Sequence, residues 1–390
     1  MGLFMRVFYV LPYRLQPNRG AAHSYISENL KLFHCNWGVT AVISPEPEKE
    51  NPPSIIKSHG IRAIFFQKRL KILSLSIPDV IMFRSWVSIA YGKALDQIFA
   101  DLDLKDGDIL ICEHTFTTDA VLKIVSKRKL NIIVKTIVHN RESRFFFNEL
   151  GFHLFKINPI KFLFNLRESF AALLYEKRVA TNSNCLCISQ GIFDYFSGVE
   201  DCKAQLFPSY PIPNGRTLKL HKRTDGVLKV GWLANFHSER NLSAFKNLER
   251  LGFLCKDFKL IVAGFGSDNL LDSNVQRSGL PIEVKGPIQN LDSFYGEIDV
   301  VLNPVNVSDG VQSKIYEAFS FGRVVYGLEK GSGGTGLESV GAVILFDRLE
   351  NLLINLSRDF LVSRRAVDKH DIDLIKKRFD KQIELVLKMV

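Results

Sequence analysis

The stretch "IDVVLNPVNVSDGVQSKIYEAFSFGRVVYG", residues 298–327, places a polar elbow and a helical pattern between two apolar runs. The runs at 299–305 and 323–328 are rich in Val and do not alternate with polar residues. This pattern is typical of strands that are buried on both faces of a parallel sheet. A strand, a crossover helix and a second strand form a βαβ unit, so the stretch predicts an α/β fold.

Outside this stretch, short apolar runs alternate with helical patterns along the chain, as in parallel sheets covered by helices. Further strands are predicted at 5–11, 39–44, 61–66, 108–112, 132–138, 185–189, 228–234, 258–264, 282–286 and 342–346. Helices are predicted at 23–33 and 118–129, and the spacing of apolar residues predicts an amphipathic helix at 371–388.

The domain organisation follows from length and composition. A chain of 390 residues is too long for one ordinary core and favours two domains. Three prolines and two glycines at 207–226 indicate a linker. We therefore expect a doubly wound domain over 1–212, a second over 213–370, and a helix over 371–390 that returns toward the first.

The composition limits the classes of molecule that the protein is expected to bind. A net charge of +10 favours an anionic partner, such as a phosphorylated substrate or an anionic membrane face. Nucleic acid is not expected, because the basic residues are spread out and no recognition motif is present. The start of the chain does not resemble a signal peptide and no run resembles a membrane span, which favours the cytoplasm. The six cysteines are scattered, which favours reduced thiols.

No metal is expected. The Cys and His residues do not have the spacing of a zinc site. The Asp-x-Asp sequence "DLD" at 101–103 lies in a polar turn and does not follow a strand end. Protein cations are expected to take the place of a metal.

The polar elbow has the composition of a phosphate site. Gly310 lets the backbone approach a ligand closely. The N–H groups at a helix start, together with the helix dipole, favour a phosphate. Lys314 adds a full positive charge. The N–H groups are those of Gly310, Val311, Gln312 and Ser313.

Glu317 lies one to two turns into the predicted helix. On an ideal wheel it points away from the apolar face formed by Ile315, Ala318 and Phe319, which leaves it available to bind the two hydroxyls of a ribose. Two plainer interpretations remain open. Asp309 resembles the N-cap residue of a helix, and Glu317 resembles a solvated surface acid.

The second half resembles the nucleotide-binding domain of the retaining, GT-B-fold glycosyltransferases of family 4, also called glycosyl transferases group 1. The signature of that family is an acid, seven residues and a glutamate. Asp309 and Glu317 match it, with Asp309 in place of the usual Glu, and "AFSFGRVVYG" follows. The segments at 230–251, 260–267 and 331–338 are also similar. Trp232 stands where the family commonly has Arg, and Arg240 represents the basic residue that follows a few positions later.

The first half is similar to the acceptor domain of the same family. Gly20 and Ala21 match the small residues that lie beside the donor phosphates, and His139 in "KTIVHN" matches a histidine near the transferred sugar. His114 in "CEHTF" ends another predicted strand and is a second candidate, on the acceptor side with Arg141.

The resemblance implies a GT-B architecture, with two Rossmann-like domains facing a cleft. It also implies transfer of a sugar from a nucleoside diphosphate to a glycan or lipid-linked glycan, with retention, without a metal, and in bacterial surface polysaccharide assembly. Lys314 and Arg240 would stabilise the leaving diphosphate, Asp309 would orient the sugar hydroxyls and His139 would contact the sugar. A nucleotide-sugar-binding protein without turnover and a nucleotide-sugar epimerase remain alternatives.

One segment suggests a membrane contact. Residues 144–178 contain eight phenylalanines interleaved with Lys and Arg. This combination suits an interfacial segment on an anionic membrane. In the alternative interpretation, the rings form the core of the first domain and a wall of its acceptor site.

Overall fold

The computed structural model describes the chain except for residues 1–4, 13–20, 46–55, 57–58, 67–84, 156–158, 208–226, 271–278, 308–312, 363–366, 368 and 389–390. The side chains of some further helical residues are also outside the description, among them those of 21–24 and 151–155. The chain divides into two compact units. Unit 1 comprises Met1–Pro211 with Lys381–Val390, and unit 2 comprises Ile212–Asp380.

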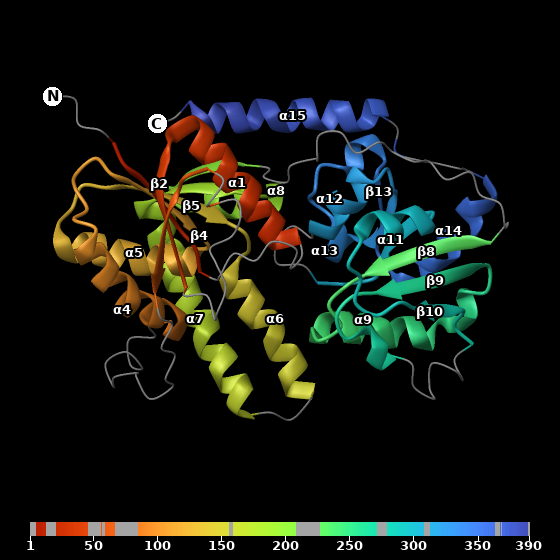
Figure 1. Ribbon diagram of the computed structural model, residues 1–390. Helices are drawn as coiled ribbons and strands as arrows, with labels where there is room; N and C mark the ends of the chain where they lie inside the picture. Colours follow the sequence, from red (N-terminus) through yellow and green to blue (C-terminus); the bar gives the residue numbers. More distant parts are fainter. Residues whose placement is uncertain are drawn as a thin grey trace. The chain divides into compact units, whose positions relative to one another are not determined.

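Within its described residues, unit 1 forms a seven-stranded sheet in the order β3-β2-β1-β4-β5-β6-β7, and every strand pair is parallel (Figure 1). The strands are β1 (Val7–Val10), β2 (Val39–Pro45), β3 (Arg62–Phe66), β4 (Ile109–Glu113), β5 (Ile133–Val138), β6 (Asn184–Cys187) and β7 (Lys203–Leu206). The helices are α1 (Ala21–Trp37), α4 (Trp86–Asp101), α5 (Thr115–Arg128), α6 (Glu142–Phe155), α7 (Pro159–Asn182) and α8 (Gln190–Ser197).

Helices cover both faces of this sheet, which explains why its central strands are apolar throughout. Val7 and Tyr9 of β1 belong to one core cluster together with Phe33 of α1. Phe8 and Val10, which point to the opposite face, belong to a second cluster with residues of α4 and α5. Successive side chains of β1 therefore pack into two different cores, one on each face of the sheet.

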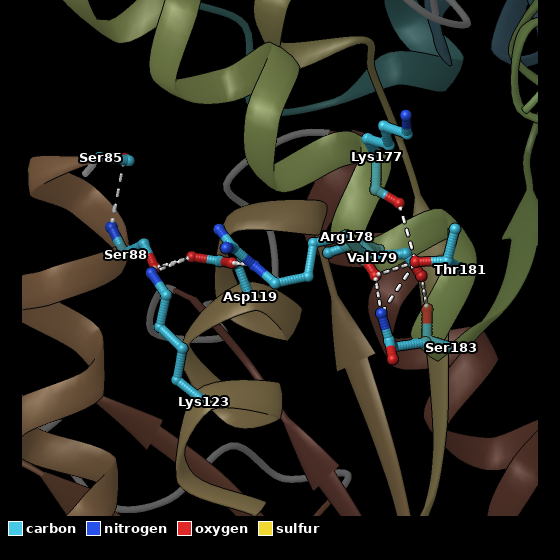
Figure 2. A network of polar contacts seen from close by, with 10 residues as sticks. Ser85, Ser88, Asp119, Lys123, Lys177, Arg178, Val179, Thr181 and Ser183 are labelled. Atoms are coloured by element: carbon cyan, nitrogen blue, oxygen red, sulfur yellow. Dashed lines mark hydrogen bonds and ion pairs between the residues drawn. The ribbon is translucent and has the colours of Figure 1, made fainter. Parts of the chain in front are cut away.

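A buried carboxylate joins three helices of unit 1 (Figure 2). Asp119 of α5 is completely buried and accepts a hydrogen bond from the hydroxyl of Ser88 in α4. It also accepts from Lys123 Nζ at 2.5 Å and from Arg178 Nε of α7 at 2.7 Å. Because a buried charge is costly unless it is paired, this carboxylate requires its cationic partners.

The described part of unit 2 forms a six-stranded sheet in the order β10-β9-β8-β11-β12-β13, again parallel. The strands are β8 (Leu228–Leu233), β9 (Phe258–Ala263), β10 (Ile282–Val284), β11 (Val300–Asn303), β12 (Val325–Leu328) and β13 (Val343–Phe346). The helices are α9 (Glu239–Arg250), α11 (Leu291–Glu297), α12 (Ser313–Ser320), α13 (Glu329–Ser332) and α14 (Leu349–Val362). Helix α15 (Lys369–Leu387) begins in unit 2, and its residues from Lys381 onward belong to unit 1.

The strands predicted from apolar runs are confirmed to within a few residues. Strand β7 was not predicted, because its sequence "KAQL" is a half-exposed edge strand with no apolar run. The predicted linker at 207–226 lies outside the described residues except for Phe207, which is buried and stacks on Phe33. No helix in the described part of the chain is long and apolar enough to cross a membrane.

Candidate functional site

Unit 2 has a topological switch point, where the strand order reverses between β8 and β11. In open α/β sheets, ligands bind beyond the carboxyl ends of the strands at such a point. The segments that leave these two strands are 234–238 and 304–312. The second segment contains the sequence of the predicted elbow, which therefore follows the end of a strand at the switch point.

The central residues of the elbow lie outside the described residues. These are Asp309, Gly310, Val311 and Gln312, whose predicted roles therefore stay predictions. Ser313 is the first residue of α12 and is half-buried. Helix α12 thus begins directly after the elbow, as the phosphate-site hypothesis requires.

Lys314 and Arg240 bring two positive charges close together. Lys314 is the second residue of α12 and Arg240 the second residue of α9, and both are half-buried. Burial, and then the nearby charge of Arg240, lower the pKa of Lys314 to about 7. No ion pair of Lys314 is found among the described residues. An anion placed between the two cations would relieve their repulsion.

Glu317 is buried. Its exposed fraction is 7%, and its Oε1 accepts a hydrogen bond of 2.8 Å from the hydroxyl of Tyr295 in α11. The interpretation of Glu317 as a solvated surface acid is therefore wrong, and a position away from the apolar face of α12 does not leave this side chain exposed. The helical wheel considered only the apolar face of α12, whereas Tyr295 packs against another side of the same helix. Arg323 Nε donates a hydrogen bond of 2.9 Å to the backbone oxygen of Tyr295.

The loop at 331–338 is tied to the end of β11 and to α12. Asn303, the last residue of β11, donates from Nδ2 to Ser332 Oγ at 2.7 Å. Tyr316 of α12 donates from its hydroxyl to the backbone oxygen of Thr335 at 2.6 Å. A Cβ atom at Gly331 would lie 1.7 Å from the backbone oxygen of Val305, so this close approach requires glycine. These contacts hold the loop against the end of β11 and against α12, the two elements that flank the elbow in the sequence.

Trp232 belongs to the core of unit 2. The side chain is completely buried in β8, with ring centroids 4.9 Å from Phe236 and 6.3 Å from Phe245 of α9. At the position where the resemblance implies Arg, this chain therefore has a core side chain. Arg240 lies in α9, and its predicted role at the diphosphate stays a prediction.

Unit 1 has its own switch point, between β1 and β4. The predicted donor residues Gly20 and Ala21 follow β1. Gly20 lies outside the described residues, and Ala21 is the first residue of α1, with its side chain not described. Their proposed contact with the donor phosphates stays a prediction.

His114 and His139 lie side by side at the ends of neighbouring strands. His114 follows β4, His139 follows β5, and their rings stack with centroids 4.3 Å apart at 19°. His114 Nδ1 lies 3.1 Å from Glu142 Oε1 in α6. His139 Nε2 bonds to Glu113 Oε2, and the hydroxyl of Tyr9 donates to the other oxygen of Glu113. The structure therefore pairs each histidine with a carboxylate.

Burial and the neighbouring His114 lower the pKa of His139, although Glu113 opposes this shift. His139 is therefore neutral at pH 7. A neutral imidazole that donates from Nε2–H to Glu113 has its lone pair on Nδ1. Such a histidine can accept a hydrogen bond from a hydroxyl group. The ring of Tyr25 packs edge-on against His139 at 5.1 Å, which restricts its orientation.

Arg141 packs against Tyr195. Its guanidinium carbon lies 3.6 Å from the ring centroid of Tyr195 in α8, which is a stacked cation–π arrangement. The Nε atom is buried and has no hydrogen-bond partner among the described residues. Its predicted role at the acceptor stays a prediction.

No protein-family model matches the chain, and no curated protein sequence matches it. Solved structures do match over almost the whole length. Lipopolysaccharide outer core galactosyltransferase WaaB, in its apo form, gives a TM-score of 0.60 at 12% identity, covering 97% of this chain and 95% of its own. Anabaena HepE in complex with UDP-glucose gives a TM-score of 0.61 at 13% identity, and the match covers 99% of this chain and 100% of HepE. Sucrose-phosphate synthase from Thermosynechococcus elongatus gives a TM-score of 0.60 at 14% identity, and the match covers 98% of this chain and 95% of the synthase chain.

The chain has the GT-B fold. The prediction of two doubly wound Rossmann-like units is thereby confirmed. In this GT-B fold, the sequence pattern located Lys314, Arg240 and Glu317 in one unit and the two histidines in the other.

Sequence reasoning missed the residues that orient the predicted groups. Glu113, Glu142 and Tyr295 belong to no motif, and each contacts a predicted residue across strands or helices. A weak signal was present in "ICEH" and "NRES", where a charged residue lies beside a candidate group at a strand end. Among the described residues, no group of three or more His, Cys, Asp and Glu side chains could hold a metal ion.

Proposed function

We propose that the protein is a glycosyltransferase that moves a sugar from a nucleoside diphosphate to an acceptor hydroxyl. The observation that carries the proposal is the pair Lys314 and Arg240 at the switch point of unit 2. Two cations held close together suit a diphosphate, which gains negative charge as the bond to the sugar breaks. The similarity to HepE, whose structure contains UDP-glucose, supports a nucleotide sugar as donor.

The proposed roles in unit 2 follow from charge and position. The elbow N–H groups, Lys314 and Arg240 bind the diphosphate without a metal, and Asp309 orients the sugar hydroxyls. Glu317 binds the ribose hydroxyls. Because Tyr295 donates to Oε1 of Glu317, the carboxylate has a fixed orientation before any ribose arrives. A preorganised acceptor loses less entropy when it binds.

In unit 1, His139 is the group proposed to contact the transferred sugar, with Glu113 fixing its ring. His114 and Arg141 are proposed for the acceptor. Retention of the anomeric configuration is proposed from the resemblance to family 4. The proposed acceptor is a glycan or lipid-linked glycan in bacterial surface polysaccharide assembly, reached from the cytoplasm.

The first experiment is a thermal-shift screen of the whole chain against UDP-, GDP-, ADP-, dTDP- and CMP-linked sugars, followed by a hydrolysis assay with the best binder. The proposal requires one nucleotide class to raise the melting temperature and to be hydrolysed slowly. Binding with no turnover, also with candidate acceptors added, would instead support a nucleotide-sugar-binding protein.

The variant Glu317→Gln tests the ribose site. Glutamine keeps the size of the side chain and can still accept from Tyr295, so the fold is preserved. Removing the charge-assisted hydrogen bonds should weaken nucleotide binding by about 10- to 100-fold. Asp347→Asn, which removes an exposed carboxylate of unit 2, is the control and should bind as the wild type does. Unchanged affinity in Glu317→Gln would reject the assignment of Glu317.

A further inference from the structure

Exposed apolar side chains gather on two helices of unit 1. Among the described residues, seven of the fourteen exposed large apolar side chains belong to α6 and α7. They are Phe147 of α6 and Ile160, Leu163, Phe164, Phe170, Leu173 and Leu174 of α7. Helices α6 and α7 lie side by side (Figure 1). We name the outward side of α7 over 160–174 the α7 face.

Helix α7 buries two glutamates and exposes large apolar side chains, which is unusual for a helix on a soluble domain. Ile160 is 80% exposed and Leu163 63% exposed, whereas Glu168 and Glu176 are almost completely buried. Glu168 accepts from Ser85 Oγ at 2.8 Å, and Glu176 accepts from Ser143 Oγ of α6 at 2.6 Å. The inward side also buries Tyr175 and smaller apolar side chains, and the outward side over 160–174 is mainly apolar.

Three phenylalanines of the segment 144–178 are exposed, so the interpretation that these rings form the core is wrong for them. They are Phe147, Phe164 and Phe170. Phe145, Phe146 and Phe162 are half-buried. A contiguous apolar surface of this kind marks an interaction site.

Exposed basic side chains lie on α7 and on the neighbouring α6. Lys161 and Lys177 are exposed near its two ends, and Arg144 is exposed on α6. The acids of α7 are Glu168 and Glu176, both directed inward, so the exposed part of α7 carries no carboxylate. Arg178, also on α7, pairs with the buried Asp119 (Figure 2).

We propose that the α7 face docks on an anionic lipid surface. The apolar side chains enter the boundary between head groups and acyl chains, and Lys161 and Lys177 lie among the lipid phosphates. Apolar rows with basic edges bind lipid interfaces in this way. A second copy of this chain fits less well, because two such faces would bring cations together without carboxylates between them. This docking requires neither a nucleotide nor the proposed transfer reaction.

Vesicle flotation with the full chain tests the proposal. We expect binding to vesicles of phosphatidylcholine with phosphatidylglycerol, and much weaker binding to phosphatidylcholine alone. The triple variant Ile160→Ser/Leu163→Ser/Leu174→Ser should lower binding by about tenfold or more, because three apolar side chains no longer leave water. The matched control is Phe253→Ser/Phe265→Ser/Leu374→Ser, which removes three exposed apolar side chains of unit 2 and should bind as the wild type does.

The double variant Lys161→Gln/Lys177→Gln tests the charge. It should weaken binding to the anionic vesicles, and added salt should weaken the binding of the wild type in the same way. The proposal would be overturned if the wild type did not bind vesicles, if the triple variant bound as strongly as the wild type, or if neutral vesicles were bound as strongly as anionic ones. It would also be overturned if the wild type formed a dimer in solution without binding vesicles and the triple variant were a monomer. Circular dichroism of each variant establishes that it folds.

Discussion

Lys314 couples anion binding to a proton. Its pKa of about 7 leaves it partly neutral at neutral pH, and a bound diphosphate would stabilise the charged form and raise that pKa. Nucleotide binding should therefore take up a proton. At pH 8 the uptake should approach one proton, because about nine-tenths of a group with this pKa is neutral there. Affinity should accordingly fall as the pH rises above about 7.

Isothermal titration in HEPES and in Tris, whose ionisation enthalpies differ, measures this uptake. Lys314→Arg is the matched variant, because guanidinium stays protonated and so keeps the positive charge at every pH used. It should bind nucleotide without proton uptake and with little dependence on pH. The same uptake in Lys314→Arg would assign the linked proton to another group.

Glu113 controls the protonation of His139. The carboxylate favours the imidazolium form and so opposes the effect of burial on the pKa of His139. Glu113→Gln should shift the midpoint of the His139 titration further below 6.5, followed by NMR of the imidazole nitrogens. Since the unfolded chain takes up this proton at higher pH, the stability of unit 1 should fall as pH drops from 6.5 toward the folded pKa.

Asp96→Asn is the control for this titration, because Asp96 pairs with Lys127 and Arg128 on the surface. It should leave the midpoint of His139 where it is. A midpoint that does not move in Glu113→Gln would mean that Glu113 is not the charge that His139 senses.

At the scale of an element, the loop at 331–338 positions the end of β11. Gly331→Ala would drive a Cβ atom into the backbone of Val305 and should destabilise the protein by about 2 kcal/mol. Nucleotide affinity should fall as well, because residues 308–312 continue from β11. Gly334→Ala, with φ of 80° and open space around its Cβ, should lose about 1 kcal/mol from backbone strain and keep its affinity.

Urea unfolding and nucleotide titration of both variants measure these effects. Equal loss of affinity in the two variants would show that the loop does not act through the end of β11. Unchanged nucleotide affinity in a stable Gly331→Ala protein would also show that the loop does not act through the end of β11.

At the scale of the whole molecule, the last helix contributes to both units. Phe379 of α15 lies 5.9 Å from the ring of Tyr316 in unit 2, and Trp37 Nε1 donates to the backbone oxygen of Leu387 in unit 1 at 3.2 Å. Val386 belongs to the core of unit 1 and is 3% exposed. Unit 1 therefore contains residues from both ends of the chain.

Val386→Ala should lower the free energy of unfolding of unit 1 by about 2 kcal/mol, because it opens a cavity in that core. Leu385→Ala is the neighbouring control, since Leu385 is 56% exposed, and should cost under about 0.5 kcal/mol. Chemical unfolding followed by tryptophan fluorescence compares the two. Equal effects of the two variants would mean that the end of α15 is not held in the core.

The sequence by itself determined the parallel sheets of both units. Apolar runs such as 39–44 and 258–264 carry a local signal, because a strand buried on both faces must be apolar throughout. The amphipathic pattern of α15 is also a local signal, because apolar residues at helical spacing form one side of the helix. Edge strand β7 shows the limit, since "KAQL" at an exposed edge has no such requirement.

Only the tertiary structure decided which groups meet. Glu113 and His139 are 26 residues apart, and the pairing of β4 with β5 brings them together. The sequence showed only phenylalanines interleaved with basic residues in this region, and the packing of α7 on α6 and α5 decided that its glutamates face inward. Glu317 is buried because Tyr295 of α11 packs on α12. Periodicity depends on the local chain, whereas contacts depend on strand order and helix packing, which residues far along the chain establish.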